Sequence, residues 1–192
     1  MVKLMKIYTR GGDGGETSLG SGVRVAKTAP RITVIGTVDE TNATIGLARL
    51  HTTGEADAML ARIQNDLFDL GADLARPETN GKNNAGADTP RLCITEKHVT
   101  RLETEMDALG EHLEALTSFV LPGGSPAAAA LHHARTVARR AERLMVALGK
   151  DEPVGADALR YINRLSDHLF QLARHLNDNG RTDVLWQPGE NG

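Results

Sequence analysis

The residues with the clearest capacity for chemistry form a glycine-rich run near the N-terminus, TRGGDGGETS at residues 9–18. Glycine lets the backbone approach an anion closely, and consecutive backbone N–H groups can form a nest that binds phosphate. Thr17, Ser18 and Lys27 add hydroxyls and a mobile positive charge, which suit a polyphosphate. Neither the G-x-x-x-x-G-K-S/T phosphate loop nor G-x-G-x-x-G is present, so a nucleotide loop and a flexible linker are both compatible with the run.

A second cluster of chemically capable side chains lies within residues 132–143. Arg135, Arg139 and Glu142 are spaced four and three apart, which places them on one face of a helix. A solvated face of Arg–Glu pairs is the simpler interpretation. Because alanines flank these charges at positions 134, 138 and 141, close approach by another helix or by a flat ligand is the competing interpretation.

Two further polar positions are ambiguous in the same way. Asn163 interrupts an apolar stripe beside Ile162, and a polar side chain at such a position needs a partner, either a neighbouring helix or a ligand. Asp39 and Glu40 are acids near the start of a predicted helix, where negative charge can serve only to favour helix formation.

The sequence predicts no metal site built from protein ligands. Helical bundles often bind iron through Glu-x-x-His motifs, and the chain contains none. His132 and His133 are adjacent, so they cannot form an i, i+4 pair, and we interpret them as surface or interface residues. Cys93 is the single cysteine, and we assign it no role beyond apolar packing.

The composition predicts one soluble helical domain. The chain has 192 residues, of which 40% are hydrophobic and 3% aromatic, so Leu and Ala must fill most of the core, and both favour helix. A net charge of -3 provides no field that would hold a nucleic-acid backbone. The sequence shows no apolar run of signal-peptide or membrane-spanning length, so we expect a cytoplasmic protein that contacts no membrane.

Apolar periodicity predicts the helices that must position these side chains. Apolar residues three and four apart indicate helices at about 31–50, 56–75, 96–116, 126–149 and 155–179. Ser125 suits the N-cap of the fourth helix and Pro126 its first position, while Asn179 and Gly180 suit a left-handed end of the fifth. Residues 8–31 and 77–90 are predicted to be loops, and residues 181–192 an irregular tail. No strand is predicted, so the fold class is all-α, a five-helix bundle.

Five motifs, in order, resemble the PduO-type ATP:cob(I)alamin adenosyltransferases, also called corrinoid adenosyltransferases. They are T-R/K-x-G-D-x-G-x-T/S-S/G-L at residues 9–19, V-D-E-x-N-A-x-I/L-G at 38–46, F-V/I-L-P-G-G at 119–124, A-R-T-x-x-R-R-A-E-R at 134–143 and Y-I/L-N-R-L-S-D-x-L-F at 161–170. Two departures occur, Thr41 where relatives often have Leu and Ala138 where Cys is frequent. Neither position carries an expected ligand contact.

The resemblance implies one domain, residues 1–192, with an ATP-binding loop at 1–31, a ferritin-like up-down bundle at 32–180 and the tail at 181–192. It also implies a homotrimer with active sites between subunits. The implied reaction is attack of the cobalt of cob(I)alamin on the 5′ carbon of ATP, giving adenosylcobalamin and triphosphate. Mg²⁺ is expected to bind through the triphosphate, and a corrinoid reductase and a cobalamin-dependent acceptor enzyme are the expected protein partners.

The same resemblance implies roles for individual residues. Phe119 would exclude the lower axial ligand of cobalamin. The alternative interpretation of Phe119 is that it packs in the core. Asp39 would pair with Arg135 across the subunit interface, and Glu142 would act through Mg²⁺ or the ribose. The catalytic set is Arg139, Phe119, Arg135 and Asp39, and the nucleotide-binding set is Thr9, Arg10, Gly11, Gly12, Thr17, Ser18, Lys27, Arg139, Arg140, Glu142, Arg143 and Asn163.

Two other functions fit a bundle of this kind. A regulator would bind the nucleotide or cobalamin without turnover, so it would release no triphosphate. A purely structural assembly would leave the protease sensitivity of residues 8–30 unchanged when ATP is added.

Overall fold

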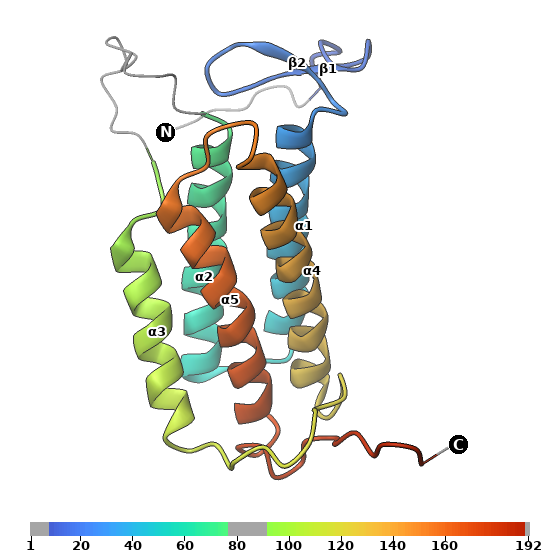
Figure 1. Cartoon of the computed structure of the whole chain (residues 1–192), viewed down its shortest axis with the longest axis vertical. Helices are drawn as coiled ribbons and strands as arrows, with labels where there is room; N and C mark the ends of the chain where they lie inside the picture. The colour runs from blue at the N-terminus through green and yellow to red at the C-terminus, as the bar shows by residue number, and fades with distance from the viewer. Residues whose placement is uncertain (1–7, 77–91, 191–192) are drawn as a thin grey trace.

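The computed structural model describes residues 8–76 and 92–190, and Figure 1 shows its arrangement. Five helices form the bundle, α1 (Pro30–Arg49), α2 (Gly54–Leu74), α3 (Glu96–Gly110), α4 (Pro126–Leu148) and α5 (Ala156–His175). The helices pack through the pairs α1–α2, α1–α4, α4–α5 and α3–α5. The predicted all-α five-helix bundle is therefore confirmed, while the loop predicted at 77–90 lies outside the described residues.

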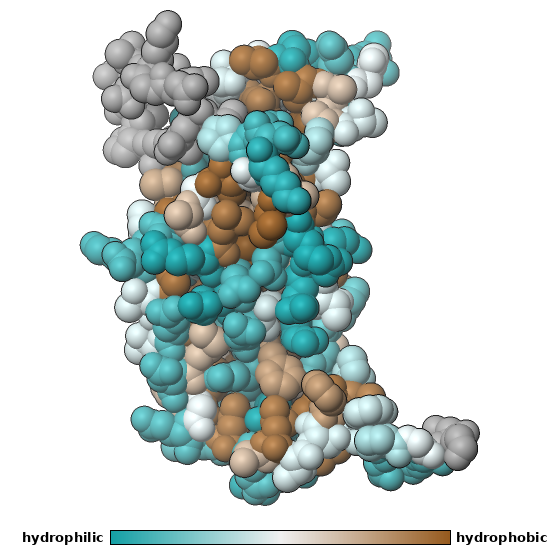
Figure 2. Space-filling view, in the orientation of Figure 1, coloured by the Kyte–Doolittle hydropathy of each residue, from teal (hydrophilic) through white to brown (hydrophobic). Residues whose placement is uncertain are grey.

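The core consists mainly of Leu, Ile, Val and Ala from all five helices, as the scarcity of aromatic residues requires. Tyr161 is the exception, a fully buried aromatic side chain on α5. Each fully buried Leu or Ile stabilises the fold by about 1.5–3 kcal/mol relative to an exposed one. Figure 2 shows that polar side chains cover much of the middle of the bundle, whereas hydrophobic surface gathers towards its two ends.

Local signals set the start of α4 and the end of α5. Ser125 Oγ accepts a hydrogen bond from the Ala128 N–H at 3.1 Å, and Pro126 occupies the first helical position, as predicted. Asp178, Asn179 and Gly180 all have positive φ, which confirms the left-handed ending. Because this ending begins before Asn179, α5 stops at His175, four residues short of the predicted boundary.

The predicted end of the third helix is wrong. The apolar stripe predicted for the third helix runs to residue 116, but α3 ends at Gly110, so Leu113 and Leu116 lie in the segment that follows. Leu116 is instead half exposed and lines a pocket. Periodicity alone does not show that the chain must leave the helix to reach the start of α4.

The prediction of no strand is also wrong. β1 (Glu16–Ser18) and β2 (Arg24–Ala26) form an antiparallel hairpin in which Thr17 pairs with Val25. Each strand has three residues, which is too short for the alternation that identifies a strand from sequence. The hairpin lies beyond the start of α1, at the end of the bundle opposite the C-terminal tail (Figure 1).

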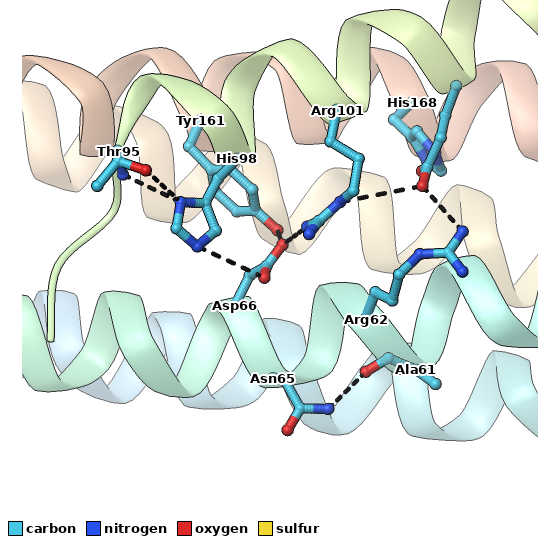
Figure 3. A network of polar contacts seen from close by, with 10 residues as sticks. Ala61, Arg62, Asn65, Asp66, Thr95, His98, Arg101, Tyr161 and His168 are labelled. Carbon is cyan, nitrogen blue, oxygen red and sulfur yellow. Dashed lines mark hydrogen bonds and ion pairs between the residues drawn. The ribbon is translucent and has the colours of Figure 1, made fainter.

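A polar network connects α3 to the neighbouring helices (Figure 3). The Tyr161 hydroxyl donates to Asp66 Oδ2 at 2.9 Å, and Arg101 of α3 forms an ion pair with the same carboxylate. One turn along α3, Glu105 lies 2.7 Å from His168 Nε2 and 2.9 Å from Arg62 Nη2. The apolar face of α3 packs mainly on α5. The ion pairs of Arg101 with Asp66 and of Glu105 with Arg62 join α3 to α2.

Replacement of Glu105 by Gln should lower the free energy of unfolding at neutral pH by about 1–3 kcal/mol, because Arg62 and His168 lose a buried charged acceptor. Burial alone would raise the pKa of Glu105, but the hydrogen bonds and charges of His168 and Arg62 outweigh it and hold the pKa below its ordinary value of 4.5. The stabilisation is therefore complete above pH 4.5 and is lost as the pH falls through the lower, folded-state pKa.

Urea unfolding of wild type and Glu105→Gln at several pH values measures this dependence. The stability difference should be largest at neutral pH and should shrink below pH 4.5. Glu103→Gln is the matched control, because Glu103 on the same helix pairs with Arg164 at a more exposed position and should contribute less than about 1 kcal/mol. A difference that grows on acidification would contradict the role of the Glu105 carboxylate.

Candidate functional site

A pocket of about 540 Å³ lies where α4 and α5 meet the segment that precedes α4. Apolar and aromatic side chains form part of its wall, and three charged side chains border it. The lining residues are Leu116, Thr117, Ser118, Phe119, Val120, Arg135, Arg139, Asp167 and Phe170. A cavity of this size, with apolar and aromatic walls and convergent polar groups, is typical of a small-molecule site.

Two arginines on successive turns of α4 give the pocket positive charge. The Arg135 guanidinium lies 5.4 Å from the centre of the Phe170 ring, a cation–π contact. Burial, followed by the charge of Arg139, lowers the pKa of Arg135, and Asp167 opposes that shift. Within the described residues neither arginine side chain forms an ion pair, so the pocket is suited to a ligand with negative charge.

Phe119 lies at the pocket wall rather than in the core. Its side chain is 76% exposed, and its ring centre lies 5.9 Å from that of Trp186 in the C-terminal tail. The alternative role in core packing is therefore wrong. An exposed aromatic pair beside a pocket provides a flat apolar surface for a ligand.

Asn163 and Glu142 bridge α5 and α4 further along the bundle. Asn163 Nδ2 donates to Glu142 Oε1 at 2.7 Å, and Asn163 Oδ1 accepts from Arg164 Nη1 at 2.9 Å. The half-buried Asn163 thus has protein partners, as one of the two interpretations of its sequence position required. The contact also brings Asn163 together with Glu142, while the assignment of both to nucleotide binding stays a prediction.

The other two arginines of residues 139–143, Arg140 and Arg143, have partners within the chain. Arg140 forms an ion pair with Glu40 of α1, and Arg143 Nη1 donates to the Arg139 backbone oxygen at 3.2 Å. Asp39 is exposed, and no ion pair within the described part of the chain joins it to Arg135. The pairing of Asp39 with Arg135 across a subunit interface therefore stays a prediction.

The glycine-rich run forms consecutive tight turns. The Asp13 N–H donates to the Arg10 oxygen at 3.2 Å, the Gly15 N–H donates to the Gly12 oxygen at 3.2 Å, and Arg10 has a positive φ of 59°. The Lys27 side chain folds over these turns, so that a Cβ atom at Gly12 would lie 3.0 Å from Lys27 Nζ. Glycine at position 12 thus leaves room for an ammonium group beside exposed backbone.

Arg24 supports the same loop, and sequence reasoning missed it. Its guanidinium donates to the Gly11 oxygen at 2.8 Å and to Ser18 Oγ at 3.3 Å, which joins β2 to the glycine turns and β1. The predicted phosphate-binding residues Thr9, Arg10, Gly11, Gly12, Thr17, Ser18 and Lys27 all lie in this folded loop, where most of them are exposed.

Within the described part of one chain, the glycine-rich loop makes no polar contact with the helical cluster, which consists of Arg139, Glu142 and Asn163. In the described ranges no hydrogen bond or ion pair joins residues 9–27 to Arg139, Glu142 or Asn163. The loop is fastened to the bundle at α2, where the Gly20 N–H donates to the Ala75 oxygen at 2.9 Å. The assignment of both groups to one nucleotide site thus stays a prediction, and no polar contact within the described part of one chain joins them.

The prediction for His132 is wrong and the prediction for His133 is right in part. His133 is exposed, but His132 is 1% exposed and lies against Phe170, with ring centres 6.0 Å apart. Burial lowers the pKa of His132, and the nearby charge of Arg135 lowers it further. The error arose because adjacent positions on a helix can face solvent and core respectively.

Asp167 and Phe170 line the pocket and Trp186 contacts Phe119, but sequence reasoning assigned none of the three a role. Asp167 and Phe170 are three apart on α5, so they share the face that borders the pocket. Trp186 is the only tryptophan of the chain and lies in a tail without periodicity, and this isolated position was the one sequence signal that could have singled it out.

Within the described residues, no group of three or more His, Cys, Asp or Glu side chains could hold a metal ion. None of the described helices combines the length and the apolar character that a membrane span requires.

Comparisons with known proteins agree with this geometry. A family model described as cobalamin adenosyltransferase matches residues 7–176. The corrinoid adenosyltransferase of Mycobacterium tuberculosis is 48% identical over 192 residues, covering 98% of this chain and 96% of that protein. The corrinoid adenosyltransferase of Bacillus subtilis is 44% identical over 178 residues, covering 90% of this chain and 87% of that protein.

Solved structures give the same result. A variant PduO-type ATP:corrinoid adenosyltransferase from Lactobacillus reuteri, complexed with cobalamin and ATP, matches with a TM-score of 0.85 at 35% identity, covering 95% of this chain and 97% of that chain. A second variant complexed with ATP matches with a TM-score of 0.82 at 36% identity, covering 95% and 100% of the two chains. The chain belongs to the cobalamin adenosyltransferase family.

Proposed function

We propose that this protein transfers the 5′-deoxyadenosyl group of ATP to the cobalt of cob(I)alamin, with release of triphosphate, at a site that combines the Phe119 pocket of one subunit with the glycine-rich loop of another. The observation that carries the proposal is a pocket with an aromatic wall and two arginines that form no ion pair within the described residues, in a chain of the cobalamin adenosyltransferase family. Similar proteins bind both cobalamin and ATP.

The reaction needs no nucleophile from the protein. The Co(I) centre of the substrate supplies an electron pair to the 5′ carbon of ATP, forming the cobalt–carbon bond and becoming Co(III). The bond from that carbon to the α-phosphate oxygen breaks, and triphosphate leaves with its electron pair. The protein contributes alignment of the two substrates and stabilisation of the leaving charge, which can supply about 7–11 and 3–4 kcal/mol respectively.

The charged residues divide between these two tasks. Arg139 at the pocket and Lys27 over the glycine turns would stabilise the triphosphate, with Thr17 and Ser18 supplying hydroxyl groups. Arg135 would be held in place by Asp39 of a neighbouring subunit. Phe119 would occupy the lower axial side of the cobalt and leave it four-coordinate, a state that is easier to reduce.

Mg²⁺ fits this site as a partner of the triphosphate. Mg²⁺ usually binds through one or two carboxylates together with substrate phosphates, rather than in a cage of protein ligands. Glu142 is a single carboxylate held by Asn163, and the described residues contain no group of three metal-binding side chains. Glu142 would therefore contact the ion, or the ribose, while the phosphates provide most of the coordination.

We further propose a homotrimer, a cytoplasmic location where ATP and reductant are available, and transient partners that supply Co(I) and accept adenosylcobalamin. Support for the oligomer comes from the lack of any polar contact between the loop and the helical cluster within the described residues of one chain. A neighbouring subunit can bring the loop to the pocket, since closed ring symmetry repeats one interface around an axis.

Mixed oligomers test the shared site. We expect Lys27→Ala and Arg139→Ala to be nearly inactive when assayed alone, because each removes positive charge from the triphosphate site. Co-refolding equal amounts should restore activity to about one quarter of the wild-type value, since random mixing unites an intact loop with an intact pocket at about a quarter of the interfaces. Adenosylcobalamin formation measures this.

The outcomes separate the parts of the proposal. If wild type makes no adenosylcobalamin, the activity is contradicted, and a binding regulator becomes the better description. If wild type is active but mixed oligomers stay inactive although exchange of subunits is verified, the site does not lie between subunits.

A further inference from the structure

A buried ionic cluster lies at the end of α5 nearest the Phe119 pocket. Arg174 Nε donates to Asp183 Oδ2 at 2.7 Å, and Asn177 Nδ2 donates to Asp183 Oδ1 at 3.1 Å. The Arg174 and Asp183 side chains are 7% and 1% exposed, and Asn177 is 1% exposed. Asp183 belongs to the tail that was predicted to be irregular. Its hydrogen bonds with Arg174 and Asn177 fix the first part of this tail to the end of α5.

The cluster also forms hydrogen bonds with both ends of the segment that carries Phe119. At one end, Arg174 Nη2 donates to the Glu114 backbone oxygen at 2.8 Å. At the other end, Asn177 Nδ2 donates to the Gly123 oxygen at 3.3 Å, and Asn177 Oδ1 accepts from the Ser125 N–H at 2.9 Å. One set of side chains therefore fixes α5, the tail and residues 114–125.

Two glycines make room for this arrangement. Gly124 and Gly180 have φ values of +95° and +90°, in the left-handed region that favours glycine. A Cβ atom at Gly180 would lie 2.6 Å from Arg174 Nη2, and one at Gly124 would overlap the Asn177 amide. The backbone on both sides of the cluster is thus shaped to the side chains that fill it.

Beyond Asp183 the tail runs antiparallel to the Phe119 segment. The Leu121 N–H donates to the Val184 oxygen at 2.7 Å, and the Trp186 N–H donates to the Phe119 oxygen at 2.8 Å. Ser118 Oγ donates to the Trp186 oxygen at 2.7 Å. In the described part of the chain no hydrogen bond joins residues 118–121 to a helix, so the tail is the support for this stretch of backbone.

We infer that Asp183 is a positioning residue for corrinoid binding, because its contacts with Arg174 and Asn177 anchor the tail strand that holds Phe119 at the pocket. The inference rests on the proposed function, in which Phe119 contacts the corrinoid. The neutral isostere at position 183 would leave the buried Arg174 without its counter-charge and would face one of the two donors, Arg174 or Asn177, with an NH2 group. The tail would then detach and Phe119 would lose its fixed place.

Asp183→Asn tests this, with Asp178→Asn as the matched control, because Asp178 forms an exposed ion pair with Arg181 in the same turn. We expect Asp183→Asn to raise the KM for cob(I)alamin about tenfold, comparable to the loss of one charged hydrogen bond, and to change the KM for ATP less than about twofold. Asp178→Asn should match wild type in both.

Trp186 provides a second readout without substrate, since it is the only tryptophan of the chain. Acrylamide should quench its fluorescence more strongly in Asp183→Asn than in wild type or Asp178→Asn. Trp186→Ala leaves the Arg174–Asn177–Asp183 cluster intact but removes the ring that contacts Phe119, so it should also raise the KM for cob(I)alamin. This second variant keeps the test valid if Asp183→Asn unfolds.

Wild-type quenching and an unchanged corrinoid KM in folded Asp183→Asn would overturn the inference, as would an unchanged corrinoid KM in Trp186→Ala. An inactive wild type would contradict the proposed function instead. In that case the quenching comparison still decides whether Asp183 anchors the tail beside Phe119.

Discussion

Arg139→Ala is expected to lower the rate of adenosyl transfer by about 10²–10³-fold, the usual effect of removing one group that stabilises transition-state charge. Arg139 borders the pocket and has no ion pair among the described residues, so its charge is available to the departing triphosphate. Arg139→Lys should recover part of the loss, because an ammonium group keeps the charge but not the forked donor geometry.

Steady-state kinetics with both substrates measure this effect. Arg160→Ala is the control, since Arg160 lies on α5 in an exposed ion pair with Asp157 and outside the pocket. Its activity should stay within about twofold of wild type, as expected for loss of a surface ion pair. If Arg139→Ala retains wild-type activity, the pocket arginines do not serve the triphosphate.

Phe119→Ala is expected to lower adenosyl transfer by about 30-fold while ATP affinity is unchanged, because truncating an aromatic anchor of a binding surface costs about 2 kcal/mol. The side chain is 76% exposed, so the free energy of unfolding should change little. The bound Co(II) corrinoid should keep its lower axial ligand, which absorption spectroscopy detects.

Phe68→Ala is the matched control, because Phe68 is a comparably exposed phenylalanine, at 71%, on α2. It should leave transfer, corrinoid coordination and ATP affinity unchanged. Full activity of Phe119→Ala with unchanged cobalt coordination would remove Phe119 from the corrinoid pocket.

The helices were predictable because each carries a long apolar stripe. In α2, Leu60, Ile63 and Leu67 repeat every three or four residues and are all buried, so the period alone indicates the helix. The strands β1 and β2 give no comparable signal, since three residues hold too little alternation. The end of α3 was mispredicted because Leu113 and Leu116 continue the period while the chain turns towards Phe119.

The site was predictable as a set of residues but not as an arrangement. The motifs identified the loop, the α4 arginines and Phe119, and the structure places Arg135, Arg139 and Phe119 in one pocket. The role of Trp186 depends on its contact with Phe119, 67 positions away in the sequence, which no local pattern encodes. In the proposed site, contact between the loop and Arg139 would need a second subunit, and only the resemblance to a known family suggested this from the sequence.

The most direct measurement of the central claim is the product balance of one turnover. Purified protein is mixed with ATP, Mg²⁺ and chemically reduced cobalamin, and adenosylcobalamin and phosphate products are quantified together. The account predicts adenosylcobalamin and triphosphate in equal amounts, because cobalt displaces the whole triphosphate from the 5′ carbon. Failure to form adenosylcobalamin, or its formation with pyrophosphate and phosphate but no triphosphate at any time in the turnover, would contradict it.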